Sequence, residues 1–126
     1  MRRLVIDDLR VMVFDAVYAR TSAAAIDLLG RDGTFDEVWF DHDLGGDDTT
    51  RPVALWLLER AFYGRAVPIG RCIVHTDNAP GRDHLRAQLG SHYETLSVDA
   101  AVYLDHCLPS PTSGAAADRS SRPRHV

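Results

Sequence analysis

The chain has 126 residues, of which 45% are hydrophobic and 25% charged, a composition typical of one globular domain. Its 14 basic and 18 acidic residues give a formal net charge of -4, which argues against dedicated binding of duplex nucleic acid. Two cysteines are too few for a disulfide framework, and the longest apolar run, residues 53–58, is much shorter than a membrane span. We therefore expect a cytoplasmic protein without a membrane partner.

The composition changes after residue 108. Residues 109–126 are rich in proline, serine, alanine and arginine, and such a segment buries too little apolar surface to fold. We predict one α/β domain over residues 1–108, followed by a disordered tail over residues 109–126. All 14 basic residues are arginines, so the chain contains no lysine.

The first predicted element is a buried strand over residues 3–6, an apolar run that ends at two carboxylates. Residues 17–20 are a candidate second strand. Only about ten residues separate the two strands, fewer than a parallel crossover usually needs, so we expect an irregular loop in place of the first helix. Three more elements are predicted before residue 63: a helix from Thr21 or Ser22 to Gly30, a strand over residues 37–41, and a helix beginning at Thr50 with Val53, Trp56, Leu57 and Phe62 inward.

The second half of the chain continues the alternation of strands and helices. Four elements are predicted there: a strand over residues 71–75, a helix from Asn78 to Gly90, a candidate strand over residues 93–98, and a helix capped by Asp99. Near-continuous apolar strands that alternate with helices are typical of a parallel sheet covered on both faces. The predicted fold is an open parallel sheet of four to five strands with helices on both faces and a reduced first helix.

Polar residues follow three of the predicted strands. In an open parallel sheet, ligands bind outside the carboxyl ends of the strands, so these residues are candidates for one shared site. Neighbouring carboxylates repel one another unless a cation lies between them, and Mg²⁺ prefers such oxygen ligands. The candidate metal ligands are Asp7, Asp8, Asp41 and Asp43.

Two histidines, His42 and His75, also lie at these strand ends. Each is able to transfer a proton near neutral pH, although a strand-end histidine also serves as a structural hydrogen-bonding group. The N-terminus of the helix after His75 is a candidate phosphate site. Its candidate residues are Thr76, Asn78, Gly81 and Arg82, and ordinary capping by Asn78 is the alternative. Arg10 either contacts a ligand or neutralises Asp7 or Asp8.

The segment Leu4-Val-Ile-Asp-Asp-Leu-Arg10, with Asp41 and Thr76 after later strands, resembles the receiver domains of two-component signalling. Those domains use paired acidic residues and a phosphoacceptor aspartate around Mg²⁺, together with a lysine on the last strand. The resemblance implies that Asp41 is the acceptor and that Asp7 and Asp8 hold the metal. The missing lysine sets this chain apart from receivers that take part in phosphorelay.

A closer resemblance is to the cyclic-phosphate processing receiver-like family. It is carried by residues 7–10, by Asp41-His-Asp-Leu-Gly45 and by residues 75–82, and it extends over about residues 3–90. Family members generally have serine where Thr76 stands. The resemblance implies a receiver-like (flavodoxin-like) fold whose pocket handles cyclic phosphates of nucleotide or ADP-ribose type.

Two functions are the leading hypotheses, and a phosphoacceptor receiver with Asp41 as the acceptor is ranked third because the chain contains no lysine. The first is a metal-dependent phosphoesterase in which the four aspartates hold Mg²⁺, His42 and His75 act as base and acid, and Thr76, Asn78 and Arg82 orient the phosphate. The second is a non-catalytic module that binds a cyclic nucleotide or a protein partner. In both, the expected partner is a small phosphorylated or cyclic-phosphate ligand or another protein, and the oligomeric state stays open.

Overall fold

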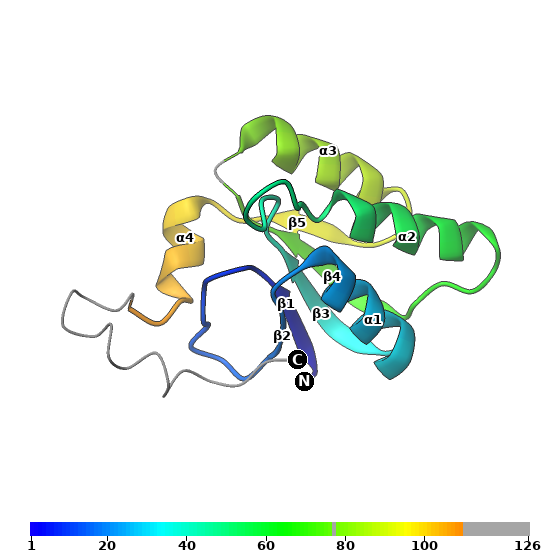
Figure 1. Cartoon of the computed structure of the whole chain (residues 1–126), viewed down its shortest axis with the longest axis horizontal. Coiled ribbons are helices and arrows are strands. Elements are labelled where there is room, and N and C mark those ends of the chain that lie inside the picture. Colours follow the sequence, from blue (N-terminus) through cyan, green and yellow to red (C-terminus); the bar gives the residue numbers. More distant parts are fainter. Residues whose placement is uncertain (77, 110–126) are drawn as a thin grey trace.

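A five-stranded parallel sheet forms the centre of the computed structural model, which describes residues 1–76 and 78–109 (Figure 1). The strands lie in the order β2-β1-β3-β4-β5, and all neighbouring pairs are parallel. Their bounds are β1 Arg3–Ile6, β2 Val17–Ala19, β3 Phe35–Phe40, β4 Ile69–Val74 and β5 Thr95–Ser97. This is the flavodoxin-like strand order, which reverses between β1 and β3. The predicted fold class is confirmed. Residues 110–126 of the predicted tail lie outside the described residues.

Three helices cover one face of the sheet, and we call this the three-helix face. They are α1 Ser22–Asp32, α2 Arg51–Phe62 and α3 Ala79–Gly90 (Figure 1). The larger core cluster fills the space between these helices and the sheet, and its fully buried members include Leu4, Ile6, Phe40, Leu57 and Leu85. Burial of this apolar surface is the main source of the fold's stability.

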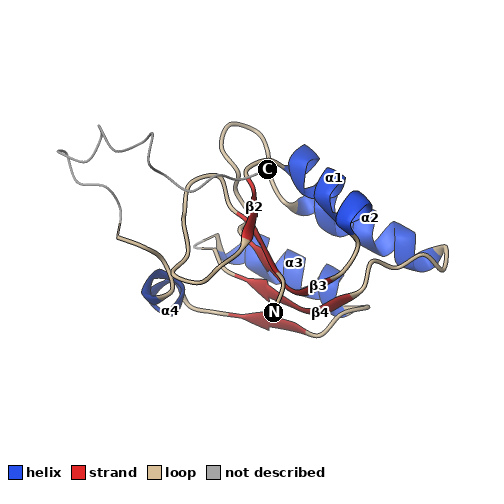
Figure 2. Cartoon of the chain, turned by 90° about the horizontal axis from the view of Figure 1, so that it is seen from below, coloured by secondary structure: helices blue, strands red, loops and turns tan. Residues whose placement is uncertain are grey.

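The opposite face, which we call the α4 face, is covered by the short helix α4 (Ala100–Asp105) and by the loop over residues 7–16. No helix forms between β1 and β2, as the short spacing predicts. The loop and the end of α4 hold each other: the Val13 amide donates to the His106 carbonyl, and the Leu108 amide donates to the Val11 carbonyl, both at 2.7 Å. Figure 2 shows α4 set apart from the other three helices.

Two sequence predictions on this framework are wrong. Helix α1 does not stop at Gly30 but continues to Asp32, and Gly33 ends it with a φ of 82°. Phe62, predicted to face inward, is 81% exposed, because the buried residues of α2 all lie in its first two turns. No helix in the described part of the chain is both long and apolar enough to cross a bilayer.

Candidate functional site

The strand register brings Asp7, Asp41 and His75 to one row at the carboxyl edge of the sheet. Ile6 is paired with Phe40, and Phe40 with Val74, so the next residue of each strand occupies the same level. Two further hydrogen bonds continue this ladder, from the Asp41 amide to the Ile6 carbonyl at 3.0 Å and from the His75 amide to the Phe40 carbonyl at 2.9 Å. The backbone therefore fixes the relative positions of the three side chains.

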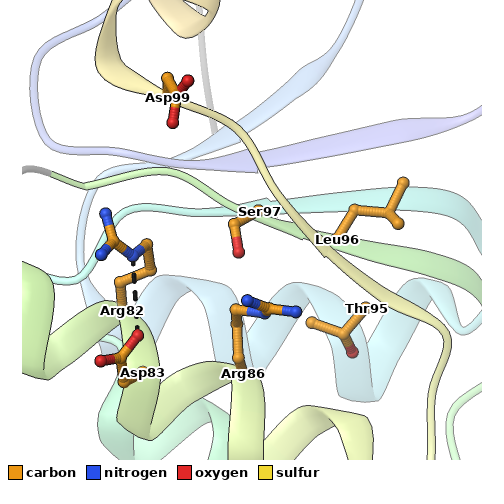
Figure 3. A pocket seen from close by; sticks show the side chains of 7 residues that line it. All are labelled: Arg82, Asp83, Arg86, Thr95, Leu96, Ser97 and Asp99. Atoms are coloured by element: carbon orange, nitrogen blue, oxygen red, sulfur yellow. Dashed lines mark ion pairs between the residues drawn. The ribbon is translucent and has the colours of Figure 1, made fainter.

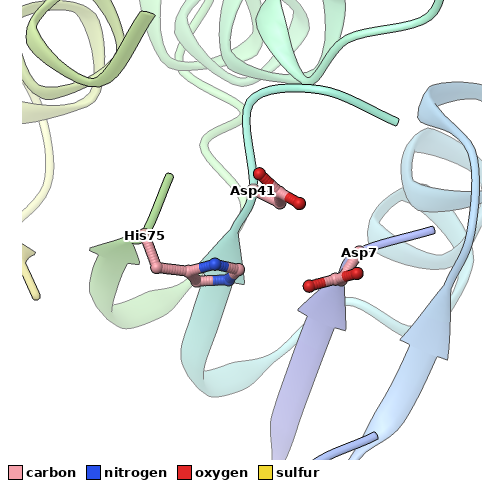
Figure 4. A group of neighbouring side chains, drawn as sticks. All are labelled: Asp7, Asp41 and His75. Carbon is pink, nitrogen blue, oxygen red and sulfur yellow. The ribbon is translucent and has the colours of Figure 1, made fainter. Parts of the chain in front are cut away.

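The three side chains lie on the α4 side of this edge. Successive residues of a strand face opposite sides of the sheet, and Val5, Trp39 and Ile73, two positions earlier, belong to the core cluster of the α4 face. Asp7, Asp41 and His75 each offer one possible ligand atom within 4.8 Å of the others (Figure 4). Asp7 and His75 are each 1% exposed, while Asp41 is partly buried. This buried group of acids and one imidazole is suited to hold a metal ion.

Hydrogen bonds fix both oxygens of Asp7. Its Oδ1 accepts from the backbone amides of Leu9 and Arg10, each at 2.9 Å, and its Oδ2 accepts from the hydroxyl of Tyr103 in α4. An ionised carboxylate has about four lone-pair positions, so these bonds orient Asp7 and still leave capacity for a cation. Asp7 is thus a buried carboxylate with a fixed orientation rather than a mobile surface acid.

His75 is packed against the same tyrosine. Its ring stacks on Tyr103 with the ring centroids 3.6 Å apart and the planes at 9°. Its Nε2 is buried and has no hydrogen-bond partner among the residues that the structure describes. The pKa of His75 is lowered to about 3: burial is the main cause, the charge of Asp7 acts in the opposite direction, and the charge of Arg10 adds to the lowering. The imidazole is therefore neutral at neutral pH, the form that binds metals.

Asp41 carries the electrostatic conflict expected from the sequence. Its pKa is raised to about 7, first by burial and then by the charges of Asp7 and Asp8, while backbone hydrogen bonds from His42 and Asp43 act in the opposite direction. Below pH 7 a proton relieves the repulsion among these carboxylates, and a divalent cation would relieve it more completely.

The other two predicted metal ligands lie outside this group of three. Asp8 is exposed and lies beside Gly45, where an added Cβ would be 3.1 Å from Asp8 Oδ2. Asp43 is also exposed, and its Oδ1 is 3.0 Å from His42 Nδ1.

His42 lies on the three-helix side of the sheet edge. Its buried ring packs against Gly81 of α3, where a Cβ would lie 2.6 Å from the ring, so a glycine is required for this close approach. Its Nδ1 is also 3.5 Å from the Asn78 side-chain nitrogen. His42 and His75 therefore contact helices on opposite faces of the sheet.

The predicted phosphate-binding residues make largely local contacts. Asn78 Oδ1 accepts from the Gly81 amide at 2.9 Å, which is ordinary helix capping, and Thr76 Oγ1 accepts from the Asn78 amide at 3.1 Å. Arg82 Nε is 3.7 Å from an Asp83 oxygen. Arg82 also lines a pocket of about 450 Å³ between α3 and β5 (Figure 3). Asp7, Asp41 and His75 do not line this pocket.

Two residues of the site have no functional motif in the sequence. Tyr103 belongs to the last predicted helix, with no motif around it, yet its hydroxyl reaches an aspartate 96 residues away in the chain. Arg20 donates from Nη1 to the carbonyls of Asp7 and Arg10, at 3.0 and 2.7 Å, and so holds the loop that follows β1. The apolar spacing of α4 is the only sequence signal for Tyr103.

Comparison with known proteins identifies the family. Residues 2–91 match the cyclic-phosphate processing receiver domain, and the chain belongs to this family. The match includes Asp7, Asp41 and His75, which we call the central group, but it ends before α4 and Tyr103. No curated protein matches the chain. One similar solved structure is a fusion protein that carries amino acids 181–211 of the yeast Spc42 trimeric coiled coil, with 16% identity, a TM-score of 0.49 and coverage of 82% of this chain and 70% of that chain.

Proposed function

We propose that this protein is a metal-dependent phosphoesterase that opens cyclic phosphates of nucleotide or ADP-ribose type. The family supports a role related to cyclic phosphates. The observation that carries the proposal is the buried group of Asp7, Asp41 and His75, whose ligand atoms lie within 4.8 Å of one another. A divalent ion on such a group polarises a phosphoryl oxygen and lowers the pKa of a bound water.

The reaction adds one water to a cyclic phosphodiester. An oxygen–phosphorus bond forms, one ring phosphorus–oxygen bond breaks, the released alkoxide takes a proton, and the product is a phosphate monoester. Asp7 and Asp41 would hold the ion, and Mg²⁺ is the ion that their carboxylates alone favour. Arg10 is a cation whose charge acts on His75, and a guanidinium near the group would be suited to orient a phosphate.

The contacts of the two histidines support unequal roles. His75 lies among the acids, whereas His42 packs against Gly81 and Asn78 on the other side of the edge. We therefore assign the reaction centre to the Asp7, Asp41 and His75 group. The role of His42 as proton-transfer partner, and of Thr76, Asn78, Gly81 and Arg82 as phosphate ligands, stays a prediction.

Phosphorus NMR tests the proposed activity directly. The purified protein is incubated with a panel of cyclic nucleotides and ADP-ribose cyclic phosphates, with Mg²⁺ or Mn²⁺ added. New monoester signals are expected for at least one substrate, and they should disappear in Asp41→Asn. Asp27→Asn is the matched control, because Asp27 is an exposed acid on α1 that pairs with Arg31 at 3.4 Å. Ligand signals that shift without conversion would favour the non-catalytic binding module.

A further inference from the structure

The donor atoms of the central group differ in kind. Asp7 and Asp41 offer carboxylate oxygens, but the third donor is an imidazole nitrogen of His75. Hard ions such as Mg²⁺ take oxygen ligands almost exclusively, whereas imidazole is a good ligand for Zn²⁺, Co²⁺ and other first-row transition ions. The presence of an imidazole nitrogen among the donor atoms therefore affects which metal ion the group selects.

The second observation is the state of the His75 side chain. The residue is 1% exposed, and its Nε2 is a buried polar atom without a hydrogen-bond partner in the described part of the chain. Buried polar atoms in folded proteins are nearly always satisfied, so an unpartnered nitrogen on a ring that offers one of its two nitrogens within 4.8 Å of both acids supports a role as a ligand. Figure 4 shows the ring extending from the end of β4 toward the two carboxylates.

The surroundings hold this nitrogen in place. The His75 ring lies flat on Tyr103, and the hydroxyl of the same tyrosine donates to Asp7 Oδ2. The other oxygen of Asp7 accepts two backbone hydrogen bonds. Outer contacts of this kind orient the ligands of metal sites and tune their affinity. One buried side chain of α4 thus positions two of the three donors.

The two acids that would add further oxygen ligands for Mg²⁺ lie at the periphery. Asp8 and Asp43 are exposed and lie outside the group of three. An ion held by Asp7, Asp41 and His75 has two oxygen ligands and one nitrogen ligand, with its remaining positions open to water or a phosphate oxygen. From this arrangement we propose that His75 is a metal ligand and that the site selects a transition ion of the Zn²⁺ or Co²⁺ class over Mg²⁺. This inference rests on the metal centre of the proposed function and replaces Mg²⁺ with another class of ion.

Metal titrations of the chelator-treated protein test the selectivity without any substrate. Calorimetry with Zn²⁺, Co²⁺ and Mg²⁺ is expected to give dissociation constants at least tenfold lower for the transition ions. In ¹⁵N-labelled protein, Zn²⁺ should shift the imidazole nitrogen resonances of His75. Equal or tighter binding of Mg²⁺, or His75 resonances that do not respond to bound Zn²⁺, would overturn the inference.

Substitutions at position 75 identify the ligand. His75→Gln should lose at least tenfold in Zn²⁺ affinity, while His92→Gln, which changes an exposed histidine, should keep it. If His75→Gln does not fold, His75→Cys gives the answer, because cysteine restores a transition-metal ligand. Its Co²⁺ complex should show a thiolate charge-transfer band that is absent from the native protein, whose own cysteines are Cys72 and Cys107. Absence of that band from a folded His75→Cys protein with Co²⁺ bound would overturn the assignment.

The outcomes separate this inference from the proposed activity. Selective Zn²⁺ binding without conversion of any cyclic phosphate supports the ligand assignment and removes the phosphoesterase. If conversion of a cyclic phosphate depends on Mg²⁺ and the His75 resonances do not respond to metal, the ligand assignment is overturned and the proposed phosphoesterase activity is supported. Failure of every ion to bind overturns both.

Discussion

The two faces of the sheet differ in what they bury. Beneath α1, α2 and α3 lies a broad apolar core whose members are almost entirely shielded from solvent. The α4 face has a smaller apolar cluster and a thinner cover, yet it also buries Asp7, Glu37 and His75. The three-helix face stabilises the fold, and the α4 face carries the buried ionisable groups Asp7, Glu37 and His75. In a chain of 126 residues this separation lets the site contain costly buried charges without weakening the main core.

The buried polar groups of the α4 face fall into two sets with different surroundings. Asp7 and His75 occupy the carboxyl edge of the sheet, where the central group lies. Glu37, in the middle of β3, is surrounded by donors: Arg3 Nε at 2.9 Å, Trp39 Nε1 at 3.2 Å and two nitrogens of Arg71 at 2.8 and 2.5 Å. Four donors thus satisfy Glu37, whereas His75 Nε2 has no hydrogen-bond partner within residues 1–76 and 78–109. Glu37 is the centre of a structural ion cluster, whereas the contacts of His75 are those on which the proposed ligand role depends.

The largest expected effect comes from the three-helix face. Leu57 is completely buried in α2, and Leu57→Ala should lower the free energy of unfolding by about 2–5 kcal/mol, measured by urea denaturation. Leu55→Ala is the matched control, because Leu55 lies in the same helix and is 60% exposed. Zn²⁺ affinity of the folded Leu57 variant should be unchanged. A parallel loss of affinity would mean that the two faces are not independent.

The next effect concerns Glu37 and the loss of folding stability at acid pH. Burial by itself raises the pKa of Glu37, but hydrogen bonds from Arg71, Arg3 and Trp39 together outweigh it and hold the pKa below its usual 4.5. The ionised form is therefore favoured in the folded state, so this contribution to stability is complete above about pH 4.5 and is lost as the pH falls through the lower folded pKa.

Glu37→Gln should lower the free energy of unfolding by about 1.5–3 kcal/mol at pH 7, the usual range for hydrogen bonds to a charged group. The difference from the native protein should shrink as the pH is lowered below 4.5, which urea denaturation at several pH values measures. A difference that stays constant down to pH 3 would show that the charge of Glu37 is not responsible. Exposed Glu59 provides the control substitution, Glu59→Gln.

Tyr103→Phe should have a smaller effect, confined to the site. The phenyl ring keeps the stack on His75 but cannot donate to Asp7 Oδ2. Loss of an outer hydrogen bond of this kind costs about tenfold in metal affinity or more, so Zn²⁺ calorimetry should show a dissociation constant raised about tenfold. Tyr103→Leu, which removes the stack as well, should raise it further.

The control for this pair is Tyr63→Phe, because Tyr63 is 64% exposed at the end of α2. If Tyr103→Phe binds Zn²⁺ as tightly as the native protein, α4 is only a cover for the sheet. The test matters because α4 lies beyond residues 2–91, where the match to the family ends.

The sequence predicts the convergence of Asp7, Asp41 and His75 because it depends on simple rules. Apolar β-branched runs indicate strands, and the carboxyl ends of parallel strands meet at one edge. The sequence does not predict that the side chains of His42 and His75 lie on opposite sides of the sheet. Each residue follows the last position of its strand, where the side that a side chain faces is no longer set by the strand. Alternation along a strand predicts such facing only while the strand continues.

The contacts of Tyr103 could not be predicted from the sequence for a different reason. Its contacts with Asp7 and His75 join segments 96 and 28 residues apart, and no local pattern encodes them. Phe62 shows the converse error: its helical spacing is that of a core residue, but α2 extends past its packed turns. Local patterns predict where a side chain points on its own element, whereas what it meets there is set by the tertiary packing.

The smallest effect tests the contact between α1 and α2. Gly30 was predicted to end α1 but lies inside it, and an added Cβ would meet the Trp56 ring at 3.5 Å, an ordinary van der Waals distance. Gly30→Ala should therefore raise the free energy of unfolding by about 0.5–1 kcal/mol, because alanine loses less backbone freedom in a helix. Gly33→Ala should have the opposite sign, since Gly33 has a φ of 82° that alanine adopts only with strain. Thermal unfolding of the two variants compares them directly. If Gly30→Ala destabilises instead, the packing of α1 on α2 has no room for a methyl group, and the three-helix face is tighter than its distances indicate.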